Sequence, residues 1–235
     1  IAFLAFLSWF GLKAKMPDTK LSIPRQPISY ILDDFKQVYK NKRFLGMTLA
    51  LPMVSMPLML WIALSPVILV EELGFSSMQY GLAQFPVLGG LILGNIVLIK
   101  IIDKLALGKS VLIGLPVMLL GTVVLIAGVI WTDYLIWCLI AGMTLISFGE
   151  GISFSVLYRF ALMSSEVSKG TVAAAVSMLL MFSFFIIIEL VRVMYEQYHL
   201  WAYSVACFVL IALWFSFPRS MLKQILKERV EQGRF

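Results

Sequence analysis

Charged side chains are scarce in this sequence, and the residues on which most soluble active sites depend are scarcer still. Asp, Glu, Lys and Arg make up 14% of the 235 residues, and the chain has one histidine and two cysteines. A single histidine excludes a paired-imidazole metal site, and Cys138 and Cys207 lie in apolar stretches that favour buried thiols over a disulfide. Nucleophile-elbow and phosphate-loop motifs are also missing. We therefore expect no cofactor, no metal and no enzymatic activity.

Long hydrophobic runs are what the sequence has in excess. Hydrophobic residues make up 61% of the chain, and its mean hydropathy is +0.95. A soluble domain of this size would need far more polar surface, whereas a membrane-spanning helix needs about 20 apolar residues. Six runs have roughly that length and predict an all-α membrane bundle. The predicted spans are Phe44–Val70, Tyr80–Ile102, Ser110–Trp131, Tyr134–Leu157, Gly170–Val193 and Leu200–Phe217.

Polar stretches divide the chain into four predicted regions. Residues 1–12 are too short to span a bilayer and read as the end of a preceding transmembrane helix, so we expect a longer protein. Residues 13–43 form a cytoplasmic loop with an amphipathic helix on the membrane surface. Residues 44–218 form the bundle, and residues 219–235 a cytoplasmic tail. The apolar stripe of the amphipathic helix consists of Ile28, Ile31, Leu32, Phe35 and Val38.

Basic residues lie almost entirely on one side of the predicted membrane. Of the nineteen Lys and Arg residues, eighteen fall in the chain ends and the loops on the same side as those ends, and only Arg192 falls in the alternate loops. Positive loops stay in the cytoplasm, so both ends are predicted to be cytoplasmic, in a multi-pass protein of the cell inner (plasma) membrane surrounded by lipid. The net charge of +6 then reflects topology and does not indicate nucleic-acid binding.

One carboxylate stands in the middle of an apolar run. Glu150 is flanked by Gly149 and Gly151. A charged group in hydrocarbon costs about 2.5–3.5 kcal/mol on insertion scales, so such residues usually face a bundle interior or a watery cavity. The glycines leave room for a substrate or for a close neighbouring helix. Glu150 is therefore either a cavity residue that attracts a cation or a proton, or a carboxylate satisfied by a hydroxyl group on an adjacent helix.

The sequence also predicts the surroundings of four other charged or titratable residues. Arg159 is nine residues from Glu150, on the opposite face of a straight helix, so the two should not pair directly. Arg159 is expected to meet a headgroup, a carbonyl or a carboxylate outside this sequence. Glu189 and Arg192 are three residues apart and predict an ion pair. His199, among boundary aromatics, is predicted to be interfacial.

Uncharged residues within the spans leave alternatives open. Gln84 and Asn95, eleven residues apart, share a helix face and either bond neighbouring helices or line a cavity. Pro52 and Pro57 are predicted to interrupt the first span, as in transporters. Trp61 lies near the middle of that span, and the residues around it form either a deformable apolar wall or ordinary packing. These neighbours are Met53, Met56, Leu58, Met59 and Ile62.

Six spans with both ends inside are typical of half a major facilitator transporter, built from three-plus-three inverted repeats. The turn 103–109, which reads DKLALGK, resembles the degenerate second copy of that superfamily's loop signature, Asp-x4-Gly-Arg/Lys. A carboxylate and cations at a tight cytoplasmic turn can latch helix ends in one conformation. The resemblance thus implies a gating role for Asp103 and Lys109.

A closer resemblance covers nearly the whole chain. The stretches 55–66 (SMPLMLWIALSP), 80–86 (YGLAQFP), 94–95 (GN) and 168–172 (SKGTV) are similar to the C-terminal half of MdfA-type multidrug/proton antiporters of the major facilitator superfamily. The resemblance implies a six-helix C-terminal bundle of a twelve-span transporter. Its partners would be small-molecule drugs, protons and the N-terminal six-helix half, which carries the family's essential carboxylates on its first span.

The resemblance also implies roles for individual residues. Arg159 would serve proton coupling at the cytoplasmic side of the drug cavity, whereas Glu150 falls where the family is expected to have an apolar residue. Its role in attracting a cation or proton therefore rests on burial alone. With these residues, the predicted proton-coupling and gating set is Glu150, Arg159, Asp103 and Lys109. The predicted substrate-binding set is Leu58, Met59, Trp61, Ile62, Gln84, Asn95, Glu150, Ser177, Met178 and Met181.

Taken together, these features predict proton-coupled efflux of lipophilic, often cationic, drugs by alternating access. A major facilitator importer or exchanger of a sugar or small metabolite is the alternative, and it would need more hydrogen-bonding groups than the apolar wall offers. An integral membrane enzyme or assembly subunit would need a nucleophile or a metal set, which the sequence does not show.

Overall fold

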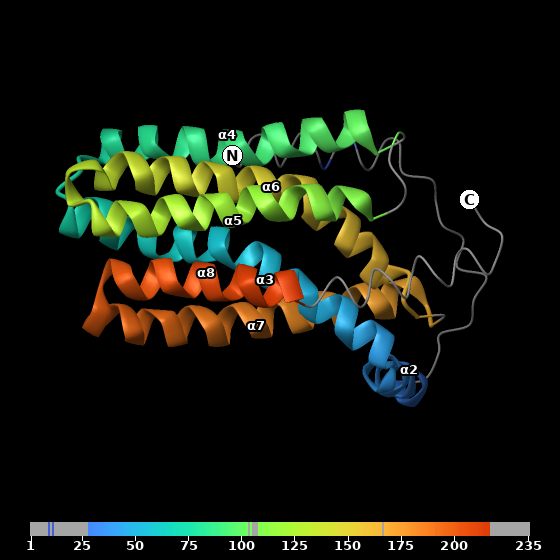
Figure 1. The fold of residues 1–235 in the computed structure, drawn as a ribbon. Helices are drawn as coiled ribbons and strands as arrows, with labels where there is room; N and C mark the ends of the chain where they lie inside the picture. The colour runs from blue at the N-terminus through green and yellow to red at the C-terminus, as the bar shows by residue number, and fades with distance from the viewer. Residues whose placement is uncertain are drawn as a thin grey trace. The chain divides into compact units, whose positions relative to one another are not determined.

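A computed structural model of the chain describes residues 28–102, 104, 108–165 and 167–216, together with residues 9 and 11. The chain divides into two compact units, residues 1–33 and residues 34–235. The described residues of the first unit are helical. The second unit contains the helical bundle (Figure 1). Apart from residues 9 and 11, the predicted end of a preceding span at residues 1–12 lies outside the described residues. Residues 13–27 of the predicted loop 13–43 and the tail 219–235 lie outside them as well.

All regular elements in the described part of the chain are helices, which confirms the predicted all-α class. Five stretches are long and apolar enough to cross a membrane, and a sixth apolar helix, α8, has 17 described residues. Each predicted span has its own helix. In chain order the elements are α2 (Ile28–Lys40), α3 (Lys42–Ser65), η1 (Pro66–Glu72), α4 (Ser77–Ile101), α5 (Lys109–Ile130), η2 (Thr132–Tyr134), α6 (Leu135–Leu162), α7 (Lys169–Tyr198) and α8 (Leu200–Ser216).

Local sequence explains where several of these helices begin. Ser76 and Gln79 form a capping box that closes the first turn of α4, because each side chain accepts a hydrogen bond from the other's backbone N–H. In the motif SKGTV, the Ser168 hydroxyl oxygen accepts from the Thr171 N–H, 3.2 Å away, at the start of α7. This motif therefore has a structural function as the start of a helix.

Prolines shape the first span differently from the prediction. Helix α3 runs through Pro52 and Pro57 without a break, so the predicted interruption there is wrong. Each proline removes only one backbone N–H, and both are buried against neighbouring helices that support the segment. The α-helix gives way at Pro66 to the wider π-helical segment η1. Its hydrogen bonds span five residues, as in the one that the Leu73 N–H donates to the Ile68 carbonyl oxygen at 3.1 Å.

The helices pair in a repeated pattern. Helix α6 packs on α4 and α5, helix α3 packs on α7 and α8, and the pairs α3–α6 and α5–α8 join the two groups. Exchanging α3 with α6, α4 with α7 and α5 with α8 converts these pairings into one another. Two inverted repeats of three helices have this property, because three spans reverse the direction of the chain across the membrane. Figure 1 shows α4, α5 and α6 on one side of the bundle and α3, α7 and α8 on the other.

Glycines bring α6 very close to its two neighbours. A Cβ atom at Gly149 would lie 2.6 Å from the Gly114 carbonyl oxygen of α5, and one at Gly151 would lie 2.5 Å from the Leu91 carbonyl oxygen of α4. Both separations are shorter than van der Waals contact, so neither position accommodates a larger residue. Of the two expectations for these glycines, the structure shows the close neighbouring helix.

Candidate functional site

Charged residues gather at the two ends of the bundle. One end, which we call the basic end, carries Lys42, Arg43, Lys100, Lys104, Lys109, Arg159 and Lys169 near the starts of α3, α5 and α7. The other, the acidic end, carries Glu71, Glu72, Asp133, Glu189, Arg192, Glu196 and His199 near η1, η2 and the α7–α8 corner. Glu150 is the charged residue between these ends in the described part of the bundle.

Glu150 faces the interior of the bundle. Its exposed fraction is 5%, and the glycines on either side of it turn toward α5 and α4. Met143, seven residues earlier and therefore on the same face of α6, has its sulfur 2.8 Å from the Tyr203 hydroxyl of α8. The Glu150 side chain thus leaves α6 on the side where α6 meets the second group of helices.

One oxygen of the Glu150 carboxyl group lacks a hydrogen-bond partner in the described part of the structure. Its buried Oε2 has no hydrogen-bond partner among the described residues, and the same holds for the hydroxyls of Ser147 and Ser153 on the same face of α6. An unsatisfied buried polar group costs about 1–3 kcal/mol, so such a group in a folded protein calls for an explanation. The position combines low exposure with an ionisable side chain, as expected for a functional residue within a membrane.

Arg159 lies elsewhere, in the last turn of α6, and it is exposed. It is on the face opposite to Glu150, and no ion pair joins the two residues in the described structure, as their spacing predicts. At the same end, Lys109 begins α5 and is exposed, while Gly108 before it has φ +90°, a conformation that favours glycine. Asp103, the carboxylate of the predicted latch, lies outside the described residues.

Helix α7 carries three residues of the predicted substrate-binding set, and all three are exposed. Met178 is 58% exposed and Met181 is 64% exposed, and Ser177 is exposed beside them. Exposed positions continue along the same face at intervals of three or four residues, which place side chains in one row. The row, which we call the α7 row, consists of Met178, Met181, Phe185, Glu189, Arg192 and Glu196.

The predicted wall residues on α3 are divided between the surface and the interior. Ile62 is 53% exposed and Met59 is half-buried, so both can contact a ligand outside the bundle. Leu58 and Trp61 are buried, and Trp61 has no exposed surface. A direct contact between either of these two and a drug would require α3 to shift. The structure thus brings Met59 and Ile62 to the surface and keeps Leu58 and Trp61 in the core.

A chain of hydrogen bonds accounts for the position of Trp61. Its indole N–H donates to the Gln84 side-chain oxygen of α4 at 2.8 Å, and the Gln84 amide nitrogen donates to the Ser65 hydroxyl at 3.3 Å. That hydroxyl also lies 3.3 Å from the Tyr80 hydroxyl. A buried tryptophan usually needs a partner for its N–H, and Gln84 supplies it. The network joins α3 to α4 just before the π-helical segment.

Asn95 takes part in a second contact between helices. Its amide nitrogen donates to the Leu91 carbonyl oxygen at 2.9 Å, and its side-chain oxygen accepts from the Ser155 hydroxyl of α6 at 3.4 Å. Gln84 and Asn95 are both half-buried and both bond neighbouring helices, which is the first of the two alternatives given by the sequence. Their partial exposure keeps either residue within reach of a ligand at that face.

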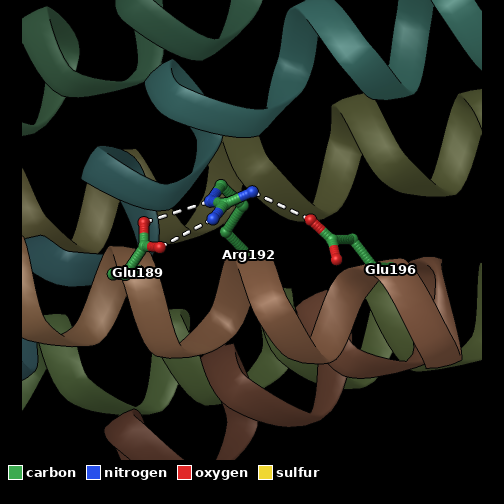
Figure 2. Close-up of polar contacts among 3 residues, drawn as sticks. All are labelled: Glu189, Arg192 and Glu196. Carbon is green, nitrogen blue, oxygen red and sulfur yellow. Dashed lines mark hydrogen bonds and ion pairs between the residues drawn. The ribbon is translucent and has the colours of Figure 1, made fainter.

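The predicted ion pair on α7 is present and is part of a larger group. Figure 2 shows the Arg192 guanidinium between two carboxylates. Its Nε and Nη2 atoms donate to the two oxygens of Glu189 at 3.0 and 2.6 Å, and Nη1 donates to Glu196 Oε1 at 2.8 Å. The sequence prediction missed Glu196, although its spacing of four residues from Arg192 is a known pairing signal.

A further contact at the acidic end ties η1 to the end of α7. The Tyr195 hydroxyl donates to Glu72 Oε2 at 2.7 Å, and His199 Nδ1 lies 3.3 Å from Glu72 Oε1. Glu72 and Tyr195 are 123 residues apart, so no local pattern could have predicted their contact. His199 is exposed at this corner, in keeping with the predicted boundary position.

The amino-acid sequence is similar to those of known drug transporters. It is 71% identical over 232 residues to the chloramphenicol resistance protein CraA of Acinetobacter baumannii, a match that covers 99% of this chain and 56% of that protein. It is 36% identical to the multidrug transporter MdfA of Yersinia pestis over 83% of this chain and 48% of that protein. The MdfA protein of Escherichia coli is 37% identical over 80% of this chain and 46% of its own length.

The similarity is confined to part of each relative. The chain spans about half the length of the curated relatives it matches. A scan against protein-family models finds no match.

Proposed function

This chain belongs to the MdfA-type multidrug transporters of the major facilitator superfamily, and we propose that it is the C-terminal half of a drug exporter. The whole transporter would move lipophilic, often cationic, drugs out of the cell in exchange for protons. The observation that carries the proposal is the high identity to a chloramphenicol resistance protein along almost the entire chain. The all-helical bundle with its repeated three-helix pairing supports it.

The proposed drug contacts are the members of the predicted substrate-binding set that reach the surface of the bundle. Met178 and Met181 on α7, with Ile62 and Met59 on α3, offer apolar and adaptable side chains at the surface of the bundle, and Ser177 adds a hydroxyl group. Gln84 and Asn95 would add hydrogen-bonding groups. Leu58 and Trp61 would support the wall from inside and meet a drug only when α3 moves. An N-terminal half opposite these helices would complete the cavity, and the two halves would rock about it.

Glu150 is proposed to act in proton coupling. Its position inside the bundle, next to the junction of the two groups of helices, favours an effect on helix packing over direct contact with a drug. A change in its charge would alter the cost of keeping α6 against the second group of helices, and this cost would bias the two conformations of the half. Arg159, Lys109 and Asp103 are proposed to act at the basic end, as gating groups near the cytoplasm.

The proposed location is the inner membrane, with the basic end toward the cytoplasm and the acidic end outside. The sequence rule for positive loops supports this orientation. Drugs, protons, lipid and the N-terminal six-helix half are the proposed partners. No role for nucleic acid is proposed, because the positive charge follows the membrane topology.

Everted membrane vesicles containing the complete transporter provide the test. Acidifying the lumen should drive ethidium uptake, because protons that leave the lumen would be exchanged for drug that enters it. A protonophore should abolish this uptake. Glu150→Gln should lower this uptake strongly, whereas Asp133→Asn in the turn η2 should not. Absence of gradient-driven uptake by the wild-type protein would reject the exporter. Unchanged uptake with Glu150→Gln would remove Glu150 from the mechanism.

A further inference from the structure

The charged end of the α7 row lies directly beyond its apolar part. Phe185 and Glu189 are four residues apart on the same face, which corresponds to about 6 Å along a helix. Arg192 and Glu196 extend the row toward the acidic end. A lipophilic molecule on Met181 and Phe185 would therefore have the charged group next to it, and on one side only.

The geometry of the charged group leaves it with a net negative charge. Arg192 donates hydrogen bonds to both oxygens of Glu189 and to one oxygen of Glu196 (Figure 2). One guanidinium thus binds two carboxylates, and Glu196 accepts its hydrogen bond from Arg192 through Oε1. A site composed in this way offers a fixed anionic oxygen that is held in place by an ion pair.

A purely structural role explains this arrangement poorly. The side chains of Glu189, Arg192 and Glu196 are at least half exposed, and ion pairs that remain in contact with water contribute little to stability. Each of the three residues lies on α7 itself, so the bonds do not join α7 to another helix. The group therefore does little for the packing of the bundle.

We propose that Glu189, Arg192 and Glu196 form a charge filter at the acidic end of the drug wall, which favours cationic over neutral lipophilic drugs. This inference rests on the proposed function and names the substrate class that this part of the wall selects. The apolar body of the drug would lie against Met181 and Phe185, and its positive group would face Glu196. A neutral drug would gain only the apolar contact, because the field of the net negative site acts on charge.

The test compares a cationic drug, ethidium, with a neutral one, chloramphenicol, in cells that carry the complete transporter at matched expression. Glu196→Gln makes the group neutral and should lower the ratio of ethidium export to chloramphenicol export by about three- to tenfold. Arg192→Gln makes the group more negative and should raise that ratio. Asp133→Asn removes one negative charge from a different turn of the same end, and should leave the ratio unchanged.

Each result has a definite meaning. A ratio that moves in opposite directions in Glu196→Gln and Arg192→Gln supports the filter. Equal changes for both drugs, or no change in the ratio, would overturn it, as would an effect of Asp133→Asn as large as that of Glu196→Gln. Failure of the proposed function has another signature, because the wild-type transporter would then export neither drug.

Discussion

Two carboxylates in this bundle, Glu150 and Glu189, have opposite surroundings. Glu150 is buried on α6 without a hydrogen-bond partner for Oε2 among the described residues, whereas Glu189 is half-exposed on α7 and accepts two hydrogen bonds from Arg192. Helix α6 is surrounded by close neighbours, whereas helix α7 has a long exposed face. Because a buried charge is costly, Glu150 can respond to the binding of a proton. The exposed charge of Glu189 costs little and can act on ligands that pass it.

The largest expected effect concerns the tight packing around Glu150. Gly149→Ala places a Cβ atom 2.6 Å from the Gly114 carbonyl oxygen and should destabilise the bundle by about 1–3 kcal/mol, because backbone cannot move away cheaply. Gly89→Ala is the matched control, since a Cβ atom there meets nothing within 4 Å. Thermal unfolding in detergent measures both. Equal effects of the two substitutions would show that α6 is not tightly enclosed.

The next effect concerns the buried carboxyl group itself. Glu150→Leu removes an unsatisfied polar group and should stabilise the bundle by about 1–3 kcal/mol, while abolishing the proposed proton coupling. Thermal unfolding and gradient-driven ethidium uptake, measured on the same variant, report the two properties separately. A loss of stability would indicate that Glu150 has a partner when the two halves are assembled, and the comparison with Glu189 would then fail.

A smaller effect is expected at the contact between η1 and α7. Tyr195→Phe removes the 2.7 Å hydrogen bond to Glu72 and should cost about 1 kcal/mol, because a bond to a carboxylate that is partly in water is weakened by the solvent. Tyr198→Phe, an exposed position three residues later, is the control and should have no effect. Unfolding temperatures measure the difference. Identical values for the two variants would mean that the acidic end is held by other contacts.

The smallest effect on stability is expected in the charged group of the α7 row. Glu189→Gln and Glu196→Gln should leave the unfolding temperature unchanged, because both side chains are at least half exposed to water. Their influence should appear only in the preference for cationic drugs. A marked drop in unfolding temperature for either variant would reassign the group to stabilising the bundle.

Much of the fold could be predicted because lipid imposes a simple rule on length and composition. Each apolar run long enough to cross a bilayer became one helix, and the ion pair at Glu189 and Arg192 followed from their spacing along α7. The proline prediction failed for a physical reason. Burial against neighbours supports α3 at Pro52 and Pro57, and such support depends on tertiary contacts that a single helix does not reveal.

The candidate site was less accessible to prediction, because it depends on which face each helix turns outward. Trp61 and Ile62 are adjacent in sequence, yet one is buried through its bond to Gln84 and the other is exposed. In a span that is apolar all round, hydrophobic periodicity does not distinguish these faces. The orientation of Glu150, by contrast, could be predicted. A charge in lipid is costly, so the sequence indicated an interior position, and the structure shows Glu150 buried.

Cysteine labelling with substrate protection tests most directly whether the exposed wall, rather than the interior of α6, meets the drug. In a complete transporter with Cys138→Ser and Cys207→Ala, Met178→Cys and Ser147→Cys would each be treated with a membrane-permeant maleimide, with and without ethidium. We predict that the thiol at position 178 reacts and that ethidium slows its reaction, while the thiol at position 147 stays unreactive. Protection at 147 with no reaction at 178 would contradict it.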